Sequence, residues 1–317
     1  SVLIVTSYPV RTAPVVRGTA QNPDVFFQGR EAANTFHDAV PGVVADVFRE
    51  LRALTGREYG LVDYEGAPDA ERVLVMMVSG SGAAGEAVAK LTAAGERVGM
   101  LTIRLFRPFP TEAFIAALPA TVRSVVVLDR TKEPGSVGEP LFQDVVTTIT
   151  ERATADRVEP NGSPILVIGG RYGLGSKEFT PAMAKAALDE PLQPAPRRRF
   201  TVGIVDDVTH LSLDVDRDFR VQSANRSAVF FALGSDGTVG ANKESVKIIG
   251  AEPGIHAQGY FVYDSKKSGS MTVSHLRYGP EPIRSTYLVD EADLVACHQF
   301  GLLDRVDVLE PARQGGT

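Results

Sequence analysis

The fold is decided by the stretch Val73-Leu74-Val75-Met76-Met77-Val78, an uninterrupted apolar run. Three similar runs follow it, over residues 98–105, 124–128 and 165–168. Apolar residues that are continuous rather than alternating are typical of strands that are covered on both faces. The four segments therefore predict buried strands of a parallel sheet.

Helical patterns separate these runs. Between the first two, Ala84, Ala87, Val88 and Leu91 recur at i, i+3, i+4 and i+7, which is one stripe of a helix over 81–94. Further helices are predicted over 111–118, 139–152 and 180–188. Strands that alternate with helices through short connections predict an α/β fold with right-handed crossovers.

A second patterned region follows residues 191–199, which carry three prolines and three arginines and are interpreted as a linker. Beyond it, strands are predicted over 229–233, 259–264, 271–276, 285–289 and 293–297, and a helix over 238–249. The fold class is therefore α/β, with parallel or mixed sheets flanked by helices in two successive domains. About the first 60 residues form a further unit that is too small to be complete.

Composition excludes several classes of protein. The 317 residues are 44% apolar and 23% charged, which is ordinary for a globular chain. The 33 Lys and Arg against 39 Asp and Glu leave a net charge of −6, so no basic field collects nucleic acid or an anionic membrane. The apolar runs are far too short to span a bilayer. We expect a cytoplasmic protein.

The single cysteine, Cys297, rules out internal disulfides and any multi-cysteine zinc or iron–sulfur site. The five histidines show no metal-ligand spacing, so we assign neither a metal site nor a catalytic residue. Cys297 beside His298 leaves two interpretations open, a thiol nucleophile and a half-buried structural cysteine. Residues 129–135 alternate in charge and are interpreted as a salt-bridged loop at a domain interface.

Two glycine-rich motifs have a structural alternative. Gly80-Ser81-Gly82-Ala83-Ala84-Gly85 is a G-x-G-x-x-G after a strand, the context of a dinucleotide site. The next strand ends in arginines rather than in the acid that binds a ribose, which would suit NADP. The alternative is a tight turn whose small residues let the helix pack closely. Residues 170–177 imitate a phosphate-binding loop, but with Ser-Lys in place of Lys-Ser.

The turn after strand 229–233 is the strongest candidate for a ligand site. It reads Gly234-Ser235-Asp236-Gly237-Thr238, and Thr238 is expected to cap the helix that follows. Free backbone N–H groups and the positive end of the helix would then bind an anion. Asn242 lies on the apolar stripe of this helix and needs partners, either in a core network or on a ligand. Lys266, in the loop 263–269, follows another strand end.

Several motifs together resemble pyruvate:ferredoxin (flavodoxin) oxidoreductases. They are Arg-Gly-Thr-Ala-Gln-Asn-Pro-Asp at 17–24, Leu-Asp-Arg-Thr-Lys-Glu-Pro-Gly at 128–135, Gly-Arg-Tyr-Gly-Leu-Gly-Ser-Lys at 170–177 and Ser-Asp-Gly-Thr-Val-Gly-Ala-Asn-Lys at 235–243. The resemblance covers nearly the whole chain. It implies a large homodimeric enzyme that decarboxylates pyruvate on thiamine diphosphate. Electrons pass through [4Fe-4S] clusters to ferredoxin or flavodoxin, and acetyl-CoA and CO2 are formed.

The resemblance also implies a domain map. Residues 1–66 are similar to the tail of the thiamine-pyrimidine domain, 67–192 to a transketolase C-terminal-like domain and 197–317 to an incomplete coenzyme A-binding domain of the gamma type. It implies coenzyme A contacts at Gly234, Ser235, Asp236, Gly237, Thr238 and Lys266. Thiamine diphosphate, Mg2+ and the clusters would be held outside this chain.

We therefore expect a piece of a longer polypeptide that is inactive alone and works with the remaining domains of the same enzyme. Two alternatives stay open, a non-catalytic docking or interaction subunit and an NADP-binding protein. The choice between ferredoxin and flavodoxin, and between pyruvate and another 2-oxoacid, also stays open.

Overall fold

The computed structural model describes residues 2–4, 16–18, 20–156, 164–263 and 270–317. The chain forms two compact units, one of residues 1–61 with 105–110 and the other of residues 62–104 with 111–317. In the first unit, strands β1 (Val2–Ile4) and β2 (Val16–Gly18) pair antiparallel. Helices α1 (Pro23–Ala32) and α2 (Asn34–Thr55) follow, and α2 ends where Gly56 adopts a left-handed conformation. These two helices, described throughout, have no buried residue.

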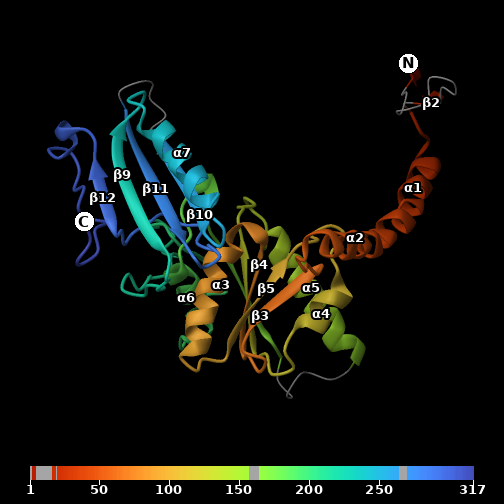
Figure 1. The fold of residues 1–317 in the computed structure, drawn as a ribbon. Coiled ribbons are helices and arrows are strands. Elements are labelled where there is room, and N and C mark those ends of the chain that lie inside the picture. The colour runs from red at the N-terminus through yellow and green to blue at the C-terminus, as the bar shows by residue number, and fades with distance from the viewer. Residues whose placement is uncertain (1, 5–15, 19, 157–163, 264–269) are drawn as a thin grey trace. The chain divides into compact units, whose positions relative to one another are not determined.

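The second unit is built on a six-stranded sheet (Figure 1). Its order is β3-β5-β4-β6-β7-β8, and every neighbouring pair is parallel except the pair formed by the edge strand β3. The bounds are β3 (Val62–Gly66), β4 (Arg72–Met77), β5 (Val98–Ile103), β6 (Ser124–Asp129), β7 (Leu166–Arg171) and β8 (Arg199–Thr201). The four strands predicted from apolar runs are confirmed as its parallel core.

Helices cover both faces of this sheet, which is why every residue of β5 and β6 is buried. Helices α3 (Val78–Ala93) and α6 (Pro181–Asp189) pack against each other and share a core with Leu74, Met100 and Phe200. Helices α4 (Thr111–Ala117) and α5 (Pro140–Asp156) contact each other, and α5 packs on β6 and β7. All four predicted helices are therefore present.

The G-x-G-x-x-G motif lies inside α3 and does not form a turn before it. The helix begins at Val78, earlier than predicted, so Gly80, Gly82 and Gly85 are helical. A Cβ at Gly82 would overlap the carbonyl oxygen of Arg284, and one at Gly85 would overlap the Arg284 guanidinium. The glycines let a distant segment lie directly on the helix. Close packing is thus the correct reading of the motif, and the dinucleotide loop is not formed.

The predicted linker is held against the six-stranded sheet. The backbone N–H and the guanidinium of Arg197 both bond to the buried carboxylate of Glu190, at 2.6 and 3.1 Å. Arg199 opens β8, and its guanidinium lies 3.7 Å from the centre of the Phe142 ring. The segment is therefore fixed at its carboxyl end. The domain boundaries 1–66, 67–192 and 197–317 stay a prediction.

A four-stranded sheet follows, in the order β10-β11-β9-β12. Its strands are β9 (Arg226–Leu233), β10 (His256–Tyr263), β11 (Met271–Gly279) and β12 (Leu294–Cys297). Only β12 is parallel to its neighbour β9. Helix α7 (Thr238–Gly250) lies along the sheet and contacts β10 and β11 (Figure 1). A separate core forms around Val229, Phe231, Val289 and Leu302.

The predicted strand at 285–289 is wrong. Its polar groups bond to side chains of the six-stranded part instead of to a neighbouring strand. The hydroxyls of Ser285 and Tyr287 donate to the Glu86 carboxylate, and the Leu288 N–H donates to Glu178. The Tyr287 and Leu288 carbonyls accept from the Arg277 guanidinium. The segment is a loop because side chains, Glu178 and Arg277, satisfy backbone groups that a strand would pair in a ladder.

A larger side chain at Gly82 should destabilise the second unit. Gly82→Ala should lower the free energy of unfolding by about 1–3 kcal/mol, because the added methyl overlaps backbone rather than a flexible side-chain end. Urea unfolding followed by circular dichroism measures this. Gly240→Ala in α7 is the control, since a Cβ there meets nothing within 4 Å. Equal stability of the two variants would contradict the packing account.

Candidate functional site

The candidate site lies where β9 and β12 end. The two strands are parallel, with Cys297 paired to Phe231, so their carboxyl ends meet at one edge of the sheet. The turn 234–237 follows β9, and His298 follows β12 with its N–H donated to the Phe231 carbonyl at 2.9 Å. This edge is where open α/β sheets place their ligands.

Asp236 holds the turn in shape. Its carboxylate accepts the N–H of Leu233 at 2.9 Å and the N–H of Thr238 at 2.8 Å. Ser235 and Gly237 both have positive φ, +74° and +92°, so the chain reverses sharply. Burial raises the pKa of Asp236, but the two backbone donors outweigh it and leave the pKa below its ordinary value. The carboxylate is therefore charged at neutral pH.

The helix start differs from the prediction. Gly237 is the N-cap residue, whereas Thr238 is the first residue of α7 and is buried. The Thr238 hydroxyl hydrogen-bonds to Nδ1 of His298 at 2.9 Å instead of capping the helix. Within the described residues, the N–H groups of Val239 and Gly240 have no acceptor. A Cβ at Gly237 or Gly240 would meet nothing within 4 Å, so space is open beside these donors.

Asn242 lies one turn further along the same face of α7. It is only 5% exposed, and its Nδ2 has no hydrogen-bond partner among the described residues. Thr272 and Ser274, buried on the adjacent strand β11, carry hydroxyls in the same condition. Asn242 is four residues after Thr238, so the two residues share one face of the helix. The Nδ2 of Asn242 therefore takes no part in a core network within the part of the chain that is described.

Five of the six predicted contact residues are thus together: Gly234, Ser235, Asp236, Gly237 and Thr238. The Gly234 N–H donates to the Ser270 carbonyl at 2.7 Å, which joins the turn to β11. Lys266 lies outside the described residues. The sequence did not link His298 to this turn, because its partner Thr238 is 60 residues away along the chain.

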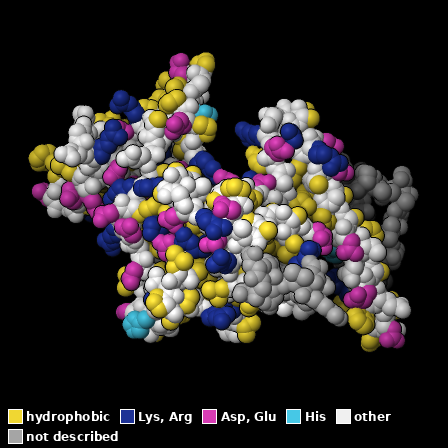
Figure 2. Space-filling view, turned by 90° about the horizontal axis from the view of Figure 1, so that it is seen from below, with side chains coloured by type: hydrophobic (Ala, Val, Ile, Leu, Met, Phe, Trp, Pro, Cys, Tyr) yellow, Lys and Arg dark blue, Asp and Glu magenta, His cyan; other side chains and the backbone are white. Residues whose placement is uncertain are grey.

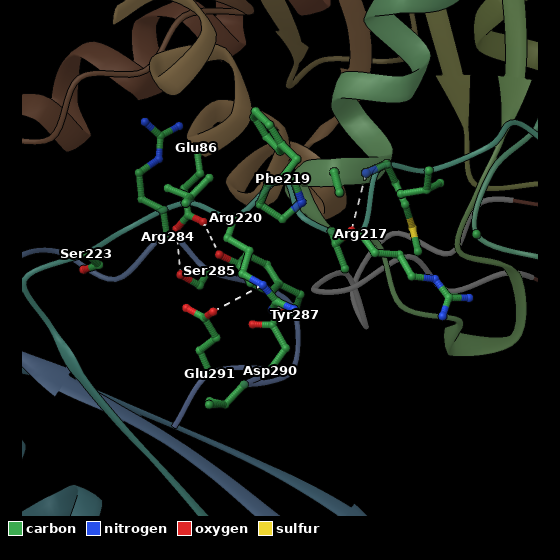
Figure 3. A pocket seen from close by; sticks show the side chains of 18 of the residues that line it. Glu86, Arg217, Phe219, Arg220, Ser223, Arg284, Ser285, Tyr287, Asp290 and Glu291 are labelled. Carbon is green, nitrogen blue, oxygen red and sulfur yellow. Dashed lines mark hydrogen bonds and ion pairs between the residues drawn. The ribbon is translucent and has the colours of Figure 1, made fainter. Parts of the chain in front are cut away.

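A large cavity lies elsewhere in the second unit (Figure 3). It has a volume of about 1470 Å³ and is lined by α3, the start of α6 and the segments 203–227 and 277–291. Some of its charged and polar side chains bond to one another. Arg220 binds Asp290 at 2.6 Å and Glu291 at 3.2 Å, and Glu86 accepts the Tyr287 hydroxyl at 2.7 Å. Burial, and then the Glu86 hydrogen bond, raise the pKa of Tyr287.

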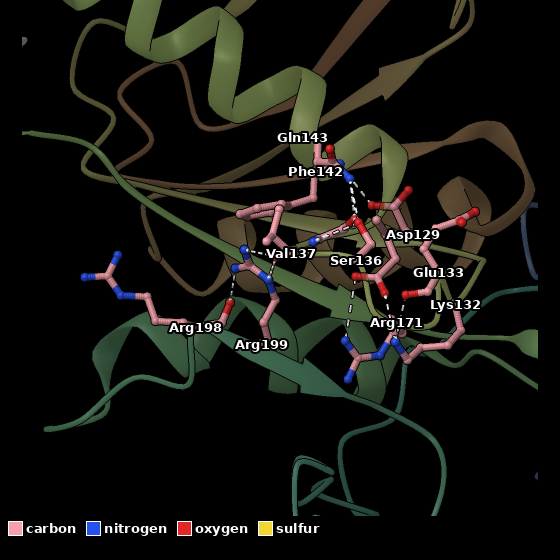
Figure 4. Close-up of polar contacts among 12 residues, drawn as sticks. Asp129, Lys132, Glu133, Ser136, Val137, Phe142, Gln143, Arg171, Arg198 and Arg199 are labelled. Carbon is pink, nitrogen blue, oxygen red and sulfur yellow. Dashed lines mark hydrogen bonds and ion pairs between the residues drawn. The ribbon is translucent and has the colours of Figure 1, made fainter.

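The loop after β6 forms a second polar cluster (Figure 4). The buried carboxylate of Asp129 accepts the N–H groups of Leu141 and Phe142, both at 3.0 Å, at the start of α5. Burial, the largest effect, raises the pKa of Asp129 to about 6 despite these donors. Buried Glu139 lies 3.8 Å from Lys132 and 3.6 Å from Arg171. The expected salt-bridged loop is confirmed, and its place at a domain interface stays a prediction.

Surface charge, metal-ligand groups and helix hydropathy bear on which kinds of binding partner this chain could have. The face in Figure 2 carries Lys and Arg interspersed with Asp and Glu, not a field of one sign. No group of three or more His, Cys, Asp or Glu among the described residues is arranged to hold a metal ion. Across the same residues, no helix has the length and hydropathy required to cross a bilayer.

Two family models match the chain. Residues 70–172 match pyruvate:ferredoxin oxidoreductase core domain II, and residues 227–317 match pyruvate ferredoxin/flavodoxin oxidoreductase. Over 96% of its length, the chain is 60% identical to a pyruvate-flavodoxin oxidoreductase of Rhodospirillum rubrum and 54% identical to a pyruvate:ferredoxin oxidoreductase of Moorella thermoacetica. The chain belongs to the pyruvate:ferredoxin (flavodoxin) oxidoreductase family.

The chain spans about a quarter of the length of these relatives, 26% and 25% respectively. A solved structure described as 2-oxoglutarate:ferredoxin oxidoreductase from Magnetococcus marinus with 2-oxoglutarate, coenzyme A and succinyl-CoA bound is 22% identical. The match covers 45% of this chain and 21% of the chain in the solved structure, with a TM-score of 0.28. A likeness of that size carries no argument about the site.

The stability of the chain should depend on the charge of Asp129. The folded-state pKa is about 6 against an ordinary value of 3.8, so folding favours the protonated acid. That contribution is complete below about pH 4 and is lost as pH rises through 6, by about 3 kcal/mol in total. Urea unfolding between pH 4 and 7 should show wild type losing stability relative to Asp129→Asn. A constant difference across that range would mean that Asp129 titrates normally.

Proposed function

We propose that this chain is a section of an enzyme that oxidatively decarboxylates pyruvate, with coenzyme A, to acetyl-CoA and CO2. The electrons pass to ferredoxin or flavodoxin. The observation that carries the proposal is 48–60% identity, over 96% of the chain, to proteins named as pyruvate-flavodoxin or pyruvate:ferredoxin oxidoreductases. Since the chain spans only a quarter of them, the complete reaction belongs to the longer enzyme.

In this proposal, the section contributes part of the coenzyme A site to the longer enzyme. We place the phosphate-bearing end of coenzyme A at the turn 234–238. The geometry supports this with two N–H groups in the first turn of α7, open space beside Gly237 and Gly240, and the buried amide of Asn242. The positive end of a helix attracts phosphate, and each charge there is worth about 0.3–2 kcal/mol. Asp236 acts by holding the turn, and Lys266 adds a positive point charge.

The redox and carbanion chemistry of the proposed reaction requires groups that other sections hold. A [4Fe-4S] cluster needs four thiolates, and the chain has one cysteine. We therefore assign thiamine diphosphate, Mg2+ and the clusters to the remaining domains of the longer enzyme, which we take to be a homodimer. No residue of this section is assigned a catalytic role.

The isolated chain should not oxidise pyruvate. The groups that would form the carbanion and accept its electrons lie outside the section under this proposal. Purified chain should give no pyruvate-dependent reduction of methyl viologen with coenzyme A, thiamine diphosphate and Mg2+ present. The longer enzyme is the positive control. Reduction by the chain alone, free of contaminating enzyme, would overturn this division of labour.

In the longer enzyme, Lys266→Ala should raise the coenzyme A concentration needed for half-maximal rate by roughly ten- to a hundred-fold. One charged hydrogen bond is worth about 1.5–3 kcal/mol. A double substitution of Asp236 and Gly237 should act in the same direction by deforming the turn. The matched control is Lys247→Ala, an exposed lysine of α7 that pairs with Glu244. An unchanged requirement in both test variants would return the turn to a structural role.

A further inference from the structure

We propose that His298 is a further ligand-contacting residue at this turn, donating from Nε2 to a phosphate group of coenzyme A. The inference rests on the proposed function and adds a residue from a different strand to the site. It begins with position. His298 is the first residue after β12, and the parallel pairing of β12 with β9 brings it to the edge at which the turn 234–238 begins.

One backbone bond and two contacts of the imidazole orient His298. Its backbone N–H donates to the Phe231 carbonyl at 2.9 Å, and Nδ1 hydrogen-bonds to the Thr238 hydroxyl at 2.9 Å. The ring meets the edge of Phe230, with ring centres 6.0 Å apart and planes at 64°. His298 is nevertheless exposed. The ring is therefore oriented before any ligand arrives, which reduces the entropy lost on binding.

The hydrogen bond to Thr238 determines which ring nitrogen of His298 is available to a ligand. With Nδ1 occupied by the hydroxyl, Nε2 is the nitrogen left for a ligand, and none of the described residues bonds to it. When Thr238 donates to Nδ1, the neutral ring carries its proton on Nε2 and presents a donor. Phosphate oxygens accept such a donor at about 2.7–2.9 Å.

The surroundings point to a ligand rather than to a structural pair alone. Thr238 opens α7, whose next two N–H groups have no acceptor within the described residues. Asn242, on the same face at i+4, buries an amide whose Nδ2 has no partner among the described residues. The donors without a described acceptor at the start of α7 and on its Thr238 face are thus two backbone amides and the Asn242 Nδ2, and the imidazole Nε2 joins them when Thr238 donates to Nδ1. An acceptor-rich group such as a phosphate matches this set.

Two substitutions of His298 distinguish a direct contact with the ligand from a structural role through Thr238. Asparagine at 298 places an amide near the position of Nδ1 and keeps the Thr238 hydrogen bond, but it lacks the Nε2 donor. Glutamine reaches the position of Nε2 and loses the Thr238 contact. In the longer enzyme, His298→Asn should raise the half-saturating coenzyme A concentration about tenfold while that for pyruvate is unaffected. His298→Gln should stay within about threefold of wild type.

The opposite order, with Gln impaired and Asn normal, would show that His298 only supports Thr238 and would overturn the inference. His256→Asn, an exposed histidine of β10, is the matched control and should not change either concentration. If both His298 variants behave as wild type while Lys266→Ala is impaired, this inference fails and the proposed function stands. If none of the three changes the coenzyme A requirement, the proposed site itself is wrong.

Discussion

The second unit depends on one contact, in which the segment 284–288 lies directly on helix α3. Glycines at 82 and 85 leave room for the backbone and guanidinium of Arg284. Glu86, one residue further on, accepts the hydroxyls of Ser285 and Tyr287 at 2.6 and 2.7 Å. Arg284 extends past the helix to pair with Glu65 on β3. The glycines of α3 thus permit close approach of the segment, and the Glu86 carboxylate fixes its position through directional hydrogen bonds.

This contact also explains how buried charge is tolerated between the two sheets. Arg277, on β11, donates to the carbonyls of Tyr287 and Leu288 at 2.7 and 2.9 Å, so the loop that rests on α3 is also bonded to the four-stranded sheet. His275, two residues before it, is buried and accepts the Val289 N–H. Burial, and then Arg277, lower the pKa of His275 to about 4, so it is neutral at pH 7 and can act as that acceptor. Arg277 and His275 therefore each have defined hydrogen-bond partners.

The candidate site differs from this contact, because several of its hydrogen-bond donors have no acceptor among the described residues. Asp236 uses its charge on the turn itself, while the first amides of α7 and the amide of Asn242 lack partners among the described residues. The buried Asn242 Nδ2, which has no acceptor among the described residues, costs free energy in the folded state, and a ligand that supplies an acceptor would recover it. The parallel pairing of β9 with β12 makes this possible by bringing His298 to the start of α7.

Local sequence by itself predicts the elements that have a distinctive local residue pattern. The apolar runs predicted the parallel strands because a strand buried on both faces has no polar positions, and the turn Gly234–Thr238 was found because positive φ favours glycine. Tertiary structure alone decided the rest. A G-x-G-x-x-G reads the same before a helix and within one, and only Arg284, about 200 residues away, shows why the glycines are needed. Likewise, 285–289 has the composition of a strand, yet the side chains of Glu178 and Arg277 bond to its backbone in place of a neighbouring strand. No local signal links His298 to the turn, because its hydrogen bond to Thr238 exists only once two strands have paired.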